Sequence, residues 1–292
     1  MIGVIGLGKM GRAIAGRLEA RGETLVVWNR TPGREQGLSA ELAATPTALC
    51  DRASLILSVL ADEAAIDAVY AGAGGILSGD LSGKTAVEFC TMSPDRARTL
   101  ERQVADAGGA FLECPVGGTV GPAEKGALLG LAGGSPAAFE VARPVLEKLT
   151  RRLEHVGPVG SGAAMKLAIN LPLMVYWSAL GEALGLAMAE GVDPSLALDI
   201  LADSSGAIGA AKMRVSPIRE MVVNGEPGGV NFALQTAMKD MGEMIALAKL
   251  HGLSSEVISA ARSRAARAME DGWSERDASL TAAYGNGLKE GW

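Results

Sequence analysis

Residues 2–11 read Ile-Gly-Val-Ile-Gly-Leu-Gly-Lys-Met-Gly, and an alanine-rich amphipathic stretch follows directly. The dinucleotide-binding fingerprint has this same order: a short apolar strand, a Gly-x-Gly-x-x-Gly loop and then a helix. In that fingerprint Gly6 permits the tight turn, Gly8 lets the backbone approach a pyrophosphate, and Gly11 lets the helix pack closely on the strand. The alternative is a purely structural glycine turn. The candidate cofactor contacts in this loop are Gly6, Leu7, Gly8, Lys9, Met10 and Gly11.

The first half of the chain alternates short β-prone runs with helical stretches. The expected strands cover residues 2–5, 25–28, 55–59, 85–89, 111–113 and 128–132. The expected helices cover residues 10–20, 62–70, 94–107 and 136–149. Strands that alternate with helices predict a parallel sheet with helices on both faces, which is an α/β domain of the Rossmann type.

A Gly-Pro-Val-Gly-Ser-Gly cluster at residues 157–162 ends this alternation and predicts a domain boundary. Beyond it we expect only helices, at residues 163–190, 194–204, 232–250 and 256–271. The predicted domains are therefore a nucleotide-binding domain at 1–161 and an all-α domain at 162–292, joined by the long helix at about 163–190. That helix is apolar almost all round, which predicts burial on every side, between domains or in an oligomer core.

Composition excludes several classes of protein. The chain has 292 residues, of which 48% are hydrophobic and 21% charged, as expected for a folded globular protein. A net charge of −6 argues against a nucleic-acid partner. No secretory signal is visible, and the longest uncharged apolar run, 167–181, is shorter than the ~20 residues of a membrane span. Three cysteines without C-x-x-C spacing are typical of a reducing compartment, so we expect a cytoplasmic protein. Two histidines provide few ligands, so we expect no metal site.

The end of the second expected strand bears on cofactor choice. NAD-binding domains place Asp or Glu there to bind the ribose 2′-hydroxyl. This chain has Asn29-Arg30-Thr31 instead, and a guanidinium binds phosphate bidentately. We therefore expect NADP(H) to be preferred, with NAD(H) as a second cofactor, and these three residues to meet the 2′-phosphate. The alternative is that Arg30 is a solvated side chain in a turn.

Lys166 lies near the start of the apolar helix expected at residues 163–190. An unpaired ammonium among apolar side chains is costly, and Asn170 follows at i+4 on the same helical face. A buried lysine with a lowered pKa can exchange protons near neutral pH, so Lys166 and Asn170 are the candidate catalytic residues. The structural alternative is a lysine that extends from the helix start into solvent. His155 and His251 are more typical of surface or packing histidines.

Four separated motifs carry a family resemblance: residues 6–11, Glu-Phe-Cys-Thr-Met-Ser-Pro at 88–94, residues 162–170, and Phe232 with Lys239-Asp240. Through them nearly the whole chain resembles the β-hydroxyacid dehydrogenase family, which includes 3-hydroxyisobutyrate dehydrogenase and short-chain aldehyde reductases. The resemblance implies a Rossmann domain joined by a long helix to an all-α domain, assembled as dimers or tetramers. It also implies a catalytic Lys166 with Asn170 as its partner. The remaining cofactor candidates are Val59, Leu60, Thr91, Phe232 and Lys239.

One motif departs from the family pattern. The family's substrate loop is typically Asp-x-Pro-Val-Ser-Gly-Gly, whereas residues 113–119 read Glu-Cys-Pro-Val-Gly-Gly-Thr. The resemblance implies that Gly117, Gly118 and Thr119 hold a substrate carboxylate, with Thr91 close by. Backbone N–H groups of the loop can still form an anion-binding nest, and the Thr119 hydroxyl can replace that of the missing serine. The departure leaves the identity of the substrate open.

The predicted function is that of an NAD(P)-dependent oxidoreductase acting on a CH–OH group. It interconverts a small 3-hydroxy or 4-hydroxy carboxylic acid and its semialdehyde or keto form, with Lys166 as general acid and base. The predicted partners are this small molecule and further copies of the chain, as a homodimer or homotetramer. Two alternatives stay open. One is an imine reductase, a group that usually carries Asp or Tyr in place of Lys166. The other is a non-catalytic NADP-binding sensor or adaptor, which the presence of Lys166 disfavours.

Overall fold

The computed structural model describes residues 1–285. It divides into two compact units, the first ending at Lys166 and the second beginning at Leu167. The division falls inside one helix, whereas the glycine cluster placed it just before that helix. The first unit therefore also contains the start of this helix.

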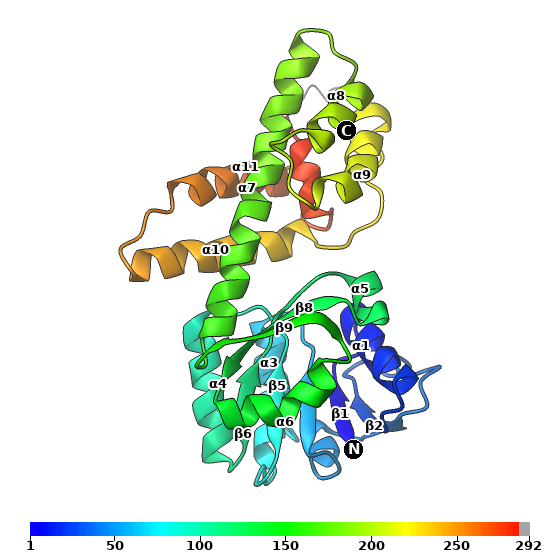
Figure 1. Cartoon of the computed structure of the whole chain (residues 1–292), viewed down its shortest axis with the longest axis vertical. Coiled ribbons are helices and arrows are strands. Elements are labelled where there is room, and N and C mark those ends of the chain that lie inside the picture. The colour runs from blue at the N-terminus through cyan, green and yellow to red at the C-terminus, as the bar shows by residue number, and fades with distance from the viewer. Residues whose placement is uncertain (286–292) are drawn as a thin grey trace. The chain divides into compact units, whose positions relative to one another are not determined.

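A nine-stranded sheet forms the centre of the first unit (Figure 1). The strands are β1 (Ile2–Ile5), β2 (Leu25–Trp28), β3 (Glu41–Leu42), β4 (Leu55–Ser58), β5 (Thr85–Glu88), β6 (Ala110–Glu113), β7 (Val116–Gly117), β8 (Leu128–Gly134) and β9 (Thr150–Gly157). Their order is β3-β2-β1-β4-β5-β6-β8-β7, and β9 pairs with β8. The chain thus has the mostly parallel α/β architecture that its sequence predicts.

The sheet departs from the expected parallel arrangement at β8, which runs antiparallel to β6 and β7. A parallel return needs a helical crossover of about a dozen residues or more. Between β6 and β8 the chain forms β7, which pairs antiparallel with β8, and the six-residue α5 (Val120–Lys125), which is too short for such a crossover helix. Three strands were not expected from the sequence. Strands β3 and β7 have two residues each, and β9 carries charged side chains on the edge of the sheet.

Helices cover both faces of this sheet because successive strand residues point to opposite sides. The helices are α1 (Lys9–Ala20), α2 (Pro46–Cys50), α3 (Glu63–Tyr70), α4 (Pro94–Asp106), α5 and α6 (Pro136–Leu146). Val4 packs with α1 and α6, whereas its neighbour Ile5 packs with α2, α3 and α4. Side-chain caps define several helix starts: Ser93 accepts from the Arg96 amide and begins α4, and Ser135 caps α6.

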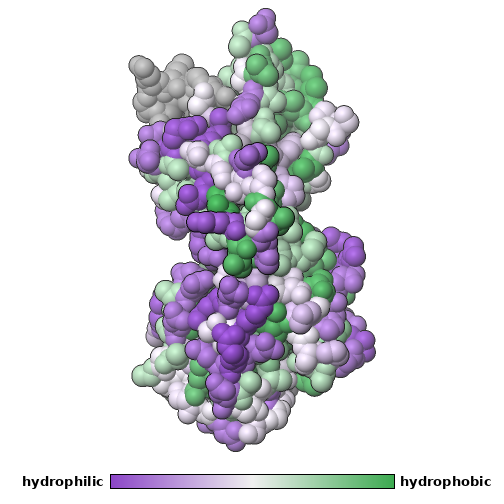
Figure 2. Space-filling model, turned by 90° about the vertical axis from the view of Figure 1, so that its left-hand side faces the viewer, coloured by the Kyte–Doolittle hydropathy of each residue, from purple (hydrophilic) through white to green (hydrophobic). Residues whose placement is uncertain are grey.

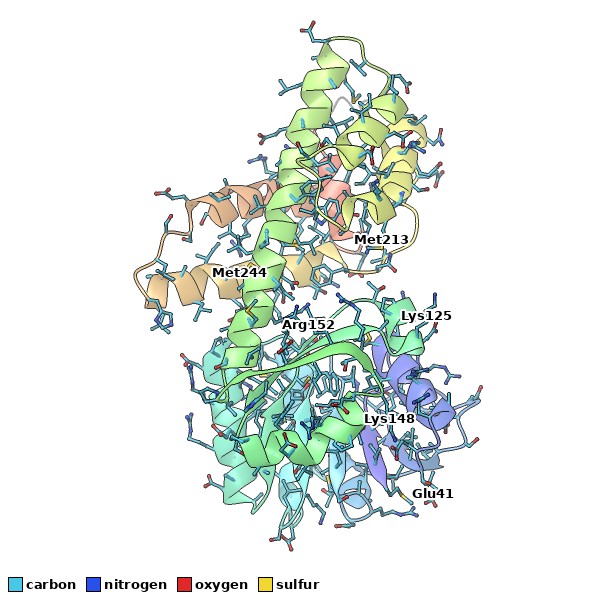
Figure 3. All side chains as sticks on the ribbon, in the orientation of Figure 1. Glu41, Lys125, Lys148, Arg152, Met213 and Met244 are labelled. Atoms are coloured by element: carbon cyan, nitrogen blue, oxygen red, sulfur yellow. The ribbon has the colours of Figure 1, made fainter. Side chains whose placement is uncertain are left out.

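A polar contact joins the beginning and the end of the first unit. The Lys148 side chain, labelled in Figure 3, forms an ion pair with Glu23. The backbone carbonyl of Lys148 accepts a hydrogen bond from Arg17 Nε at 3.0 Å. Helix α1, which follows the glycine loop, is thereby attached to the segment between α6 and β9.

The described part of the second unit is helical, with one isolated bridge between Ala233 and Asp277 and no strand. Its helices are α7 (Ser161–Ala189), which begins in the first unit, α8 (Pro194–Asp203), α9 (Ala211–Asn224), α10 (Leu234–Leu250) and α11 (Glu256–Glu270). Their core includes Leu184, Leu198, Ile218 and Trp273. Helix α9 was not expected because Pro217 interrupts its periodic pattern. The all-α second domain is thus confirmed.

Helix α7 is less buried than its composition predicts. Only 28% of its most apolar 18-residue window is buried, and Leu186 is 74% exposed. The expectation of burial on all sides is therefore wrong for a single chain. Among the described residues, α7 is also the one helix that is long and apolar enough to span a bilayer by length and composition. Core helices of soluble proteins pass the same test, so this is weak evidence for a membrane span.

Candidate active site

The candidate cofactor residues of the first unit gather at one edge of the sheet. Strands β2, β1, β4, β5 and β6 are parallel neighbours in register, so their carboxyl ends meet at that edge. Asn29 follows β2, Gly6 follows β1, Val59 follows β4, and Thr91 lies three residues beyond β5. Open α/β sheets bind ligands at this edge, where the strand order reverses between β1 and β4. Residues predicted from four separate segments are thus brought together.

The glycine loop has the geometry that a pyrophosphate requires. Gly6 has a φ of +89°, and a Cβ on Gly11 would lie 1.8 Å from the Gly6 carbonyl oxygen. No atom lies within 4 Å of a Cβ built on Gly8, which is the N-cap residue of α1. The first turn of α1 has neither a side-chain cap nor an acidic residue. The positive end of the α1 dipole is therefore not neutralised by a carboxylate of its first turn, and the loop fits a dinucleotide pyrophosphate.

Asn29 has a structural role that its sequence position did not reveal. Its Oδ1 accepts from the Leu7 amide at 2.8 Å, and its Nδ2 donates to the Thr31 carbonyl at 2.7 Å. Asn29 thus joins the glycine loop to the end of β2. Of the three residues expected at the 2′-phosphate, Arg30 and Thr31 have exposed side chains beyond β2. Val59 and Leu60 lie against Gly6, since a Cβ there would be 2.3 Å from the Val59 carbonyl oxygen.

A buried carboxyl supports the turn that carries Thr91. Glu88, the last residue of β5, is fully buried, and its Oε1 accepts from the Cys90 amide at 2.8 Å. Burial raises the pKa of Glu88 to about 7, although the Ser58 hydroxyl, the Cys90 amide and the Tyr70 hydroxyl act in the opposite direction. The sequence signal for this residue is a carboxylate within an apolar strand, which by itself indicates no particular role.

We expect Glu88 to make the first unit less stable as the pH rises from 4.5 to about 7. Over that interval the unfolded chain releases the proton that the folded protein retains, and folded and unfolded forms carry the same charge outside it. A shift from 4.5 to about 7 corresponds to on the order of 3 kcal/mol. Denaturant titration should therefore show that the free energy of unfolding of Glu88→Gln increases relative to that of the wild type as the pH rises from 4.5 to 8. The exposed Glu147→Gln should show no such gain, and a pH-independent difference for Glu88→Gln would contradict the assignment.

The loop predicted to bind a carboxylate follows β6 and pairs with β8. Gly117 belongs to β7, opposite Leu129. Gly118 has a φ of +128°, and a Cβ there would lie 2.8 Å from Leu128 Cδ2. Thr119 is the N-cap residue of α5, but its side chain makes no capping hydrogen bond. Its hydroxyl is therefore not used to start the helix.

The two candidate catalytic residues lie four positions apart in α7. Lys166 is half-buried, and Asn170 is 7% exposed. Asn170 Nδ2 donates to Asp240 Oδ2 at 3.3 Å, and Asp240, in α10, is only 1% exposed. Lys239 Nζ lies 3.8 Å from Asp240 Oδ1. Asp240 is not among the site residues predicted from the sequence, although it belongs to the Lys239-Asp240 motif, because its burial and its bond to Asn170 depend on the packing of α10 against α7.

Phe232 lies in the segment before α10, which begins two residues later than expected. The buried Asp277 holds this segment, because its Oδ2 accepts from the amides of Asn231 at 2.8 Å and Phe232 at 3.1 Å. Arg214 Nη1 lies 3.7 Å from the same oxygen. Asp277 therefore positions the backbone on which Phe232 is presented.

The remaining polar candidates have structural surroundings. The ring of His155 stacks on Phe139 with centroids 4.8 Å apart, and its Nε2 lies 2.8 Å from the Gly134 carbonyl oxygen. His251 is the C-cap residue of α10. Within residues 1–285 no group of three or more His, Cys, Asp or Glu side chains could hold a metal ion.

Two family models match the chain in succession. Residues 1–157 match the NAD-binding domain of 6-phosphogluconate dehydrogenase, and residues 160–284 match the NAD-binding domain of NADP-dependent 3-hydroxyisobutyrate dehydrogenase. Glyoxylate/succinic semialdehyde reductase 2 from Arabidopsis thaliana is 34% identical over 94% of this chain and 76% of its own. The 3-hydroxyisobutyrate dehydrogenase from Pseudomonas aeruginosa is 30% identical over 85% of each chain.

Solved structures share the fold at lower identity. A 3-hydroxyisobutyrate dehydrogenase from Salmonella typhimurium superposes with a TM-score of 0.84 at 22% identity, covering 96% of this chain and 98% of its own. An imine reductase from Myxococcus stipitatus with bound NADP+ gives a TM-score of 0.63 at 23% identity, over 97% and 99% of the two chains. Both comparisons describe the fold alone, and the architecture is common to dehydrogenases and imine reductases.

Proposed function

Because this chain belongs to the β-hydroxyacid dehydrogenase family and is an NAD(P)-dependent oxidoreductase of CH–OH groups, we propose that it interconverts a small 3-hydroxy or 4-hydroxy carboxylic acid and its semialdehyde. The observation that carries this proposal is the polar set on α7, with Lys166 four residues before a buried Asn170 that is bonded to Asp240. A proton donor one helical turn from a fixed amide suits reduction of a carbonyl group, because the developing alkoxide needs a proton.

In the proposed reaction each group has a separate task. A nicotinamide cofactor held at the Gly6–Gly11 loop would supply or accept the hydride. Lys166 holds a proton at Nζ and donates it to the substrate oxygen, or removes it in the oxidative direction. Asp240 holds the Asn170 amide by accepting from Nδ2, which leaves the amide oxygen directed away from that bond. The Gly117–Thr119 loop receives the substrate carboxylate through its N–H groups and the Thr119 hydroxyl, which is not used as a helix cap.

A substrate panel tests this proposal directly. Small semialdehydes, 2-oxoacids, 3-hydroxy and 4-hydroxy acids and cyclic imines are assayed with NADPH, NADH and their oxidised forms. We expect the highest kcat/KM for a short semialdehyde that carries a carboxylate. Turnover of cyclic imines but not of semialdehydes would favour the imine reductase alternative. Tight NADPH binding without turnover of any compound would favour the sensor or adaptor.

We also propose that the enzyme prefers NADP(H), with Arg30 at the 2′-phosphate. Arg30 is exposed beyond β2, no carboxylate stands at the end of that strand, and the Asn29 Oδ1 accepts from the Leu7 amide. A charge-assisted bond to phosphate contributes ~1.5–3 kcal/mol. Arg30→Ala should therefore raise KM for NADPH at least ~10-fold and leave KM for NADH within ~2-fold. The exposed Arg21→Ala, at the far end of α1, is the charge-matched control, and equal changes for both cofactors would contradict the role of Arg30.

Oligomerisation is proposed from the helical unit's surface. Several large apolar side chains of this unit are exposed, including Leu186 at 74%, Met213 at 74% and Ile200 at 58%. Met213 is labelled in Figure 3, and hydrophobic surface is visible on the upper part of Figure 2. Exposed apolar area of this kind typically marks an interaction site, and we propose that a second copy of the chain covers it. Sedimentation equilibrium at micromolar concentration should give a dimer or tetramer, and a monomer would refute the proposal.

A further inference from the structure

Glu113, the last residue of β6, is a carboxylate buried at the start of α7. It is fully buried, and its Oε1 accepts three backbone hydrogen bonds. The donors are the amides of Gly160 at 2.7 Å, Gly162 at 2.8 Å and Ala163 at 3.2 Å. The first N–H groups of a helix have no partner within it. In α7 the amides of Gly162 and Ala163, and that of Gly160 just before the helix, donate to this one distant carboxylate oxygen, while the Ser161 amide donates to the Pro158 carbonyl.

Two glycines leave room for this carboxylate. A Cβ on Gly133 in β8 would lie 2.4 Å from Glu113 Oε1 and 2.8 Å from the Gly162 amide. A Cβ on Gly162 would lie 2.5 Å from the Leu131 carbonyl oxygen and 3.2 Å from Glu113 Cγ. Helix α7 can therefore begin directly against β8 only because both positions lack a side chain. The contact is a close-packed anchor, in which small displacements are resisted by backbone atoms.

The charge surroundings of Glu113 agree with an anchoring role. Burial raises its pKa to about 7, while the amides of Ala163, Gly160 and Gly162 and the Arg98 guanidinium act in the opposite direction. Its second oxygen, Oε2, has no hydrogen-bond partner within the described residues. Ionised or protonated, the side chain keeps Oε1 as an acceptor, so the anchor does not depend on the charge.

Glu113 differs from its neighbour Glu88 in what it holds. The two residues are register partners on adjacent parallel strands, and both are fully buried. Glu88 accepts from Cys90 in the turn directly after its own strand, whereas Glu113 accepts from residues 47 to 50 positions along the chain. Of the two, only Glu113 bonds to the helix that carries Lys166.

We infer that Glu113 is a positioning residue: it fixes where α7 begins and thereby sets the position of Lys166, one turn further along the helix. This inference rests on the proposed role of Lys166. Without the acceptor, three buried N–H groups would lose their partner, and the first turn of α7 would shift or fray to reach water. A displacement of that kind removes proton transfer while the glycine loop, on the β1 side of the sheet, still binds nucleotide.

The test is a double-mutant cycle between Glu113 and Lys166. Glu113→Leu, which removes the acceptor at similar volume, should lower kcat at least ~10-fold while the Kd for NADPH stays within ~3-fold. In a Lys166→Ala background the same change should alter the residual rate less than ~2-fold, because its effect passes through the lysine. Glu113→Gln keeps Oε1 and should restore most of the activity. Equal losses in both backgrounds, or wild-type kcat in Glu113→Leu, would overturn the inference.

A second measurement does not depend on catalysis. Hydrogen exchange in the cofactor-free protein should be faster at the amides of Gly162 and Ala163 in Glu113→Leu than in the wild type. Ser135→Ala, which removes the cap of α6, should lose stability without changing kcat or this exchange. If Glu113→Leu does not fold, Glu113→Asp is used instead. It keeps the charge but shortens the side chain by one methylene, and it should likewise increase exchange at Gly162 and Ala163. If Lys166→Ala keeps turnover, the proposed function fails, while unchanged exchange in Glu113→Leu would refute the anchor itself.

Discussion

Lys166→Ala is expected to lower kcat for semialdehyde reduction at least ~10²-fold, the usual scale of lost general acid catalysis. Lys166 is half-buried near the start of α7, and the substitution removes the ammonium without altering the glycine loop. The Kd for NADPH, measured by fluorescence titration, should therefore stay within ~3-fold. Turnover above about a tenth of the wild-type value would contradict proton transfer by Lys166.

Two further variants separate charge from proton transfer. Lys166→Arg keeps a positive charge, but a guanidinium does not release its proton near neutral pH, so kcat should remain low. Lys125→Ala removes the same kind of side chain from the exposed end of α5 (Figure 3) and should leave kcat unchanged. Full activity in Lys166→Arg would mean that the residue acts through its charge alone.

The second large effect is expected at Gly11, where added volume meets backbone. A Cβ there would lie 1.8 Å from the Gly6 carbonyl oxygen and 3.3 Å from Val59 Cβ, so α1 must move away from β1. Gly11→Ala should cost at least about 2 kcal/mol in the free energy of unfolding. It should also raise the Kd for NADPH at least ~100-fold, because the N–H groups that receive the pyrophosphate move with the helix.

Two other glycines of the same segment provide matched controls. Apart from chain neighbours and the backbone of α1 itself, no atom lies within 4 Å of a Cβ on Gly8 or on Gly16. Gly8→Ala should therefore keep stability but weaken NADPH binding, because its methyl group enters the space that the pyrophosphate needs. Gly16→Ala, inside α1, should keep binding and gain up to ~1 kcal/mol of stability. Calorimetry and cofactor titration separate the three outcomes, and unchanged binding in Gly8→Ala would place the pyrophosphate elsewhere.

Most elements of the fold could be predicted because their signals are local. Strands β1 and β2 begin and end where expected, since each is a short buried run bounded by turn residues. Helix starts follow from caps such as Ser135, whose hydroxyl acts three residues away. The edge strand β9 and helix α9 were missed because charged residues in one and Pro217 in the other obscure the periodic pattern. The family resemblance is confirmed by both family models.

The candidate site was predictable in its parts but not in its contacts. Lys166 and Asn170 were identified from one helical turn of sequence. The bond from Asn170 to Asp240 joins residues 70 positions apart, and nothing in the spacing indicates it. Asn29 was expected at a phosphate, yet the structure shows its side chain bonded to Leu7 and Thr31. A short polar side chain next to a loop forms hydrogen bonds with the backbone N–H and C=O groups that lie close to it in the folded protein.

Sequence alone was sufficient for the glycine turn, the alternation of strands and helices, and the placement of a lysine in an apolar helix. Each of these depends on neighbours within about four residues, whose geometry is the same in every protein. Tertiary structure decided the antiparallel course of β8, the exposure of α7 and the capture of its first N–H groups by Glu113. These features depend on which distant segments pack together, because a buried donor or acceptor takes the partner that the folded chain places beside it.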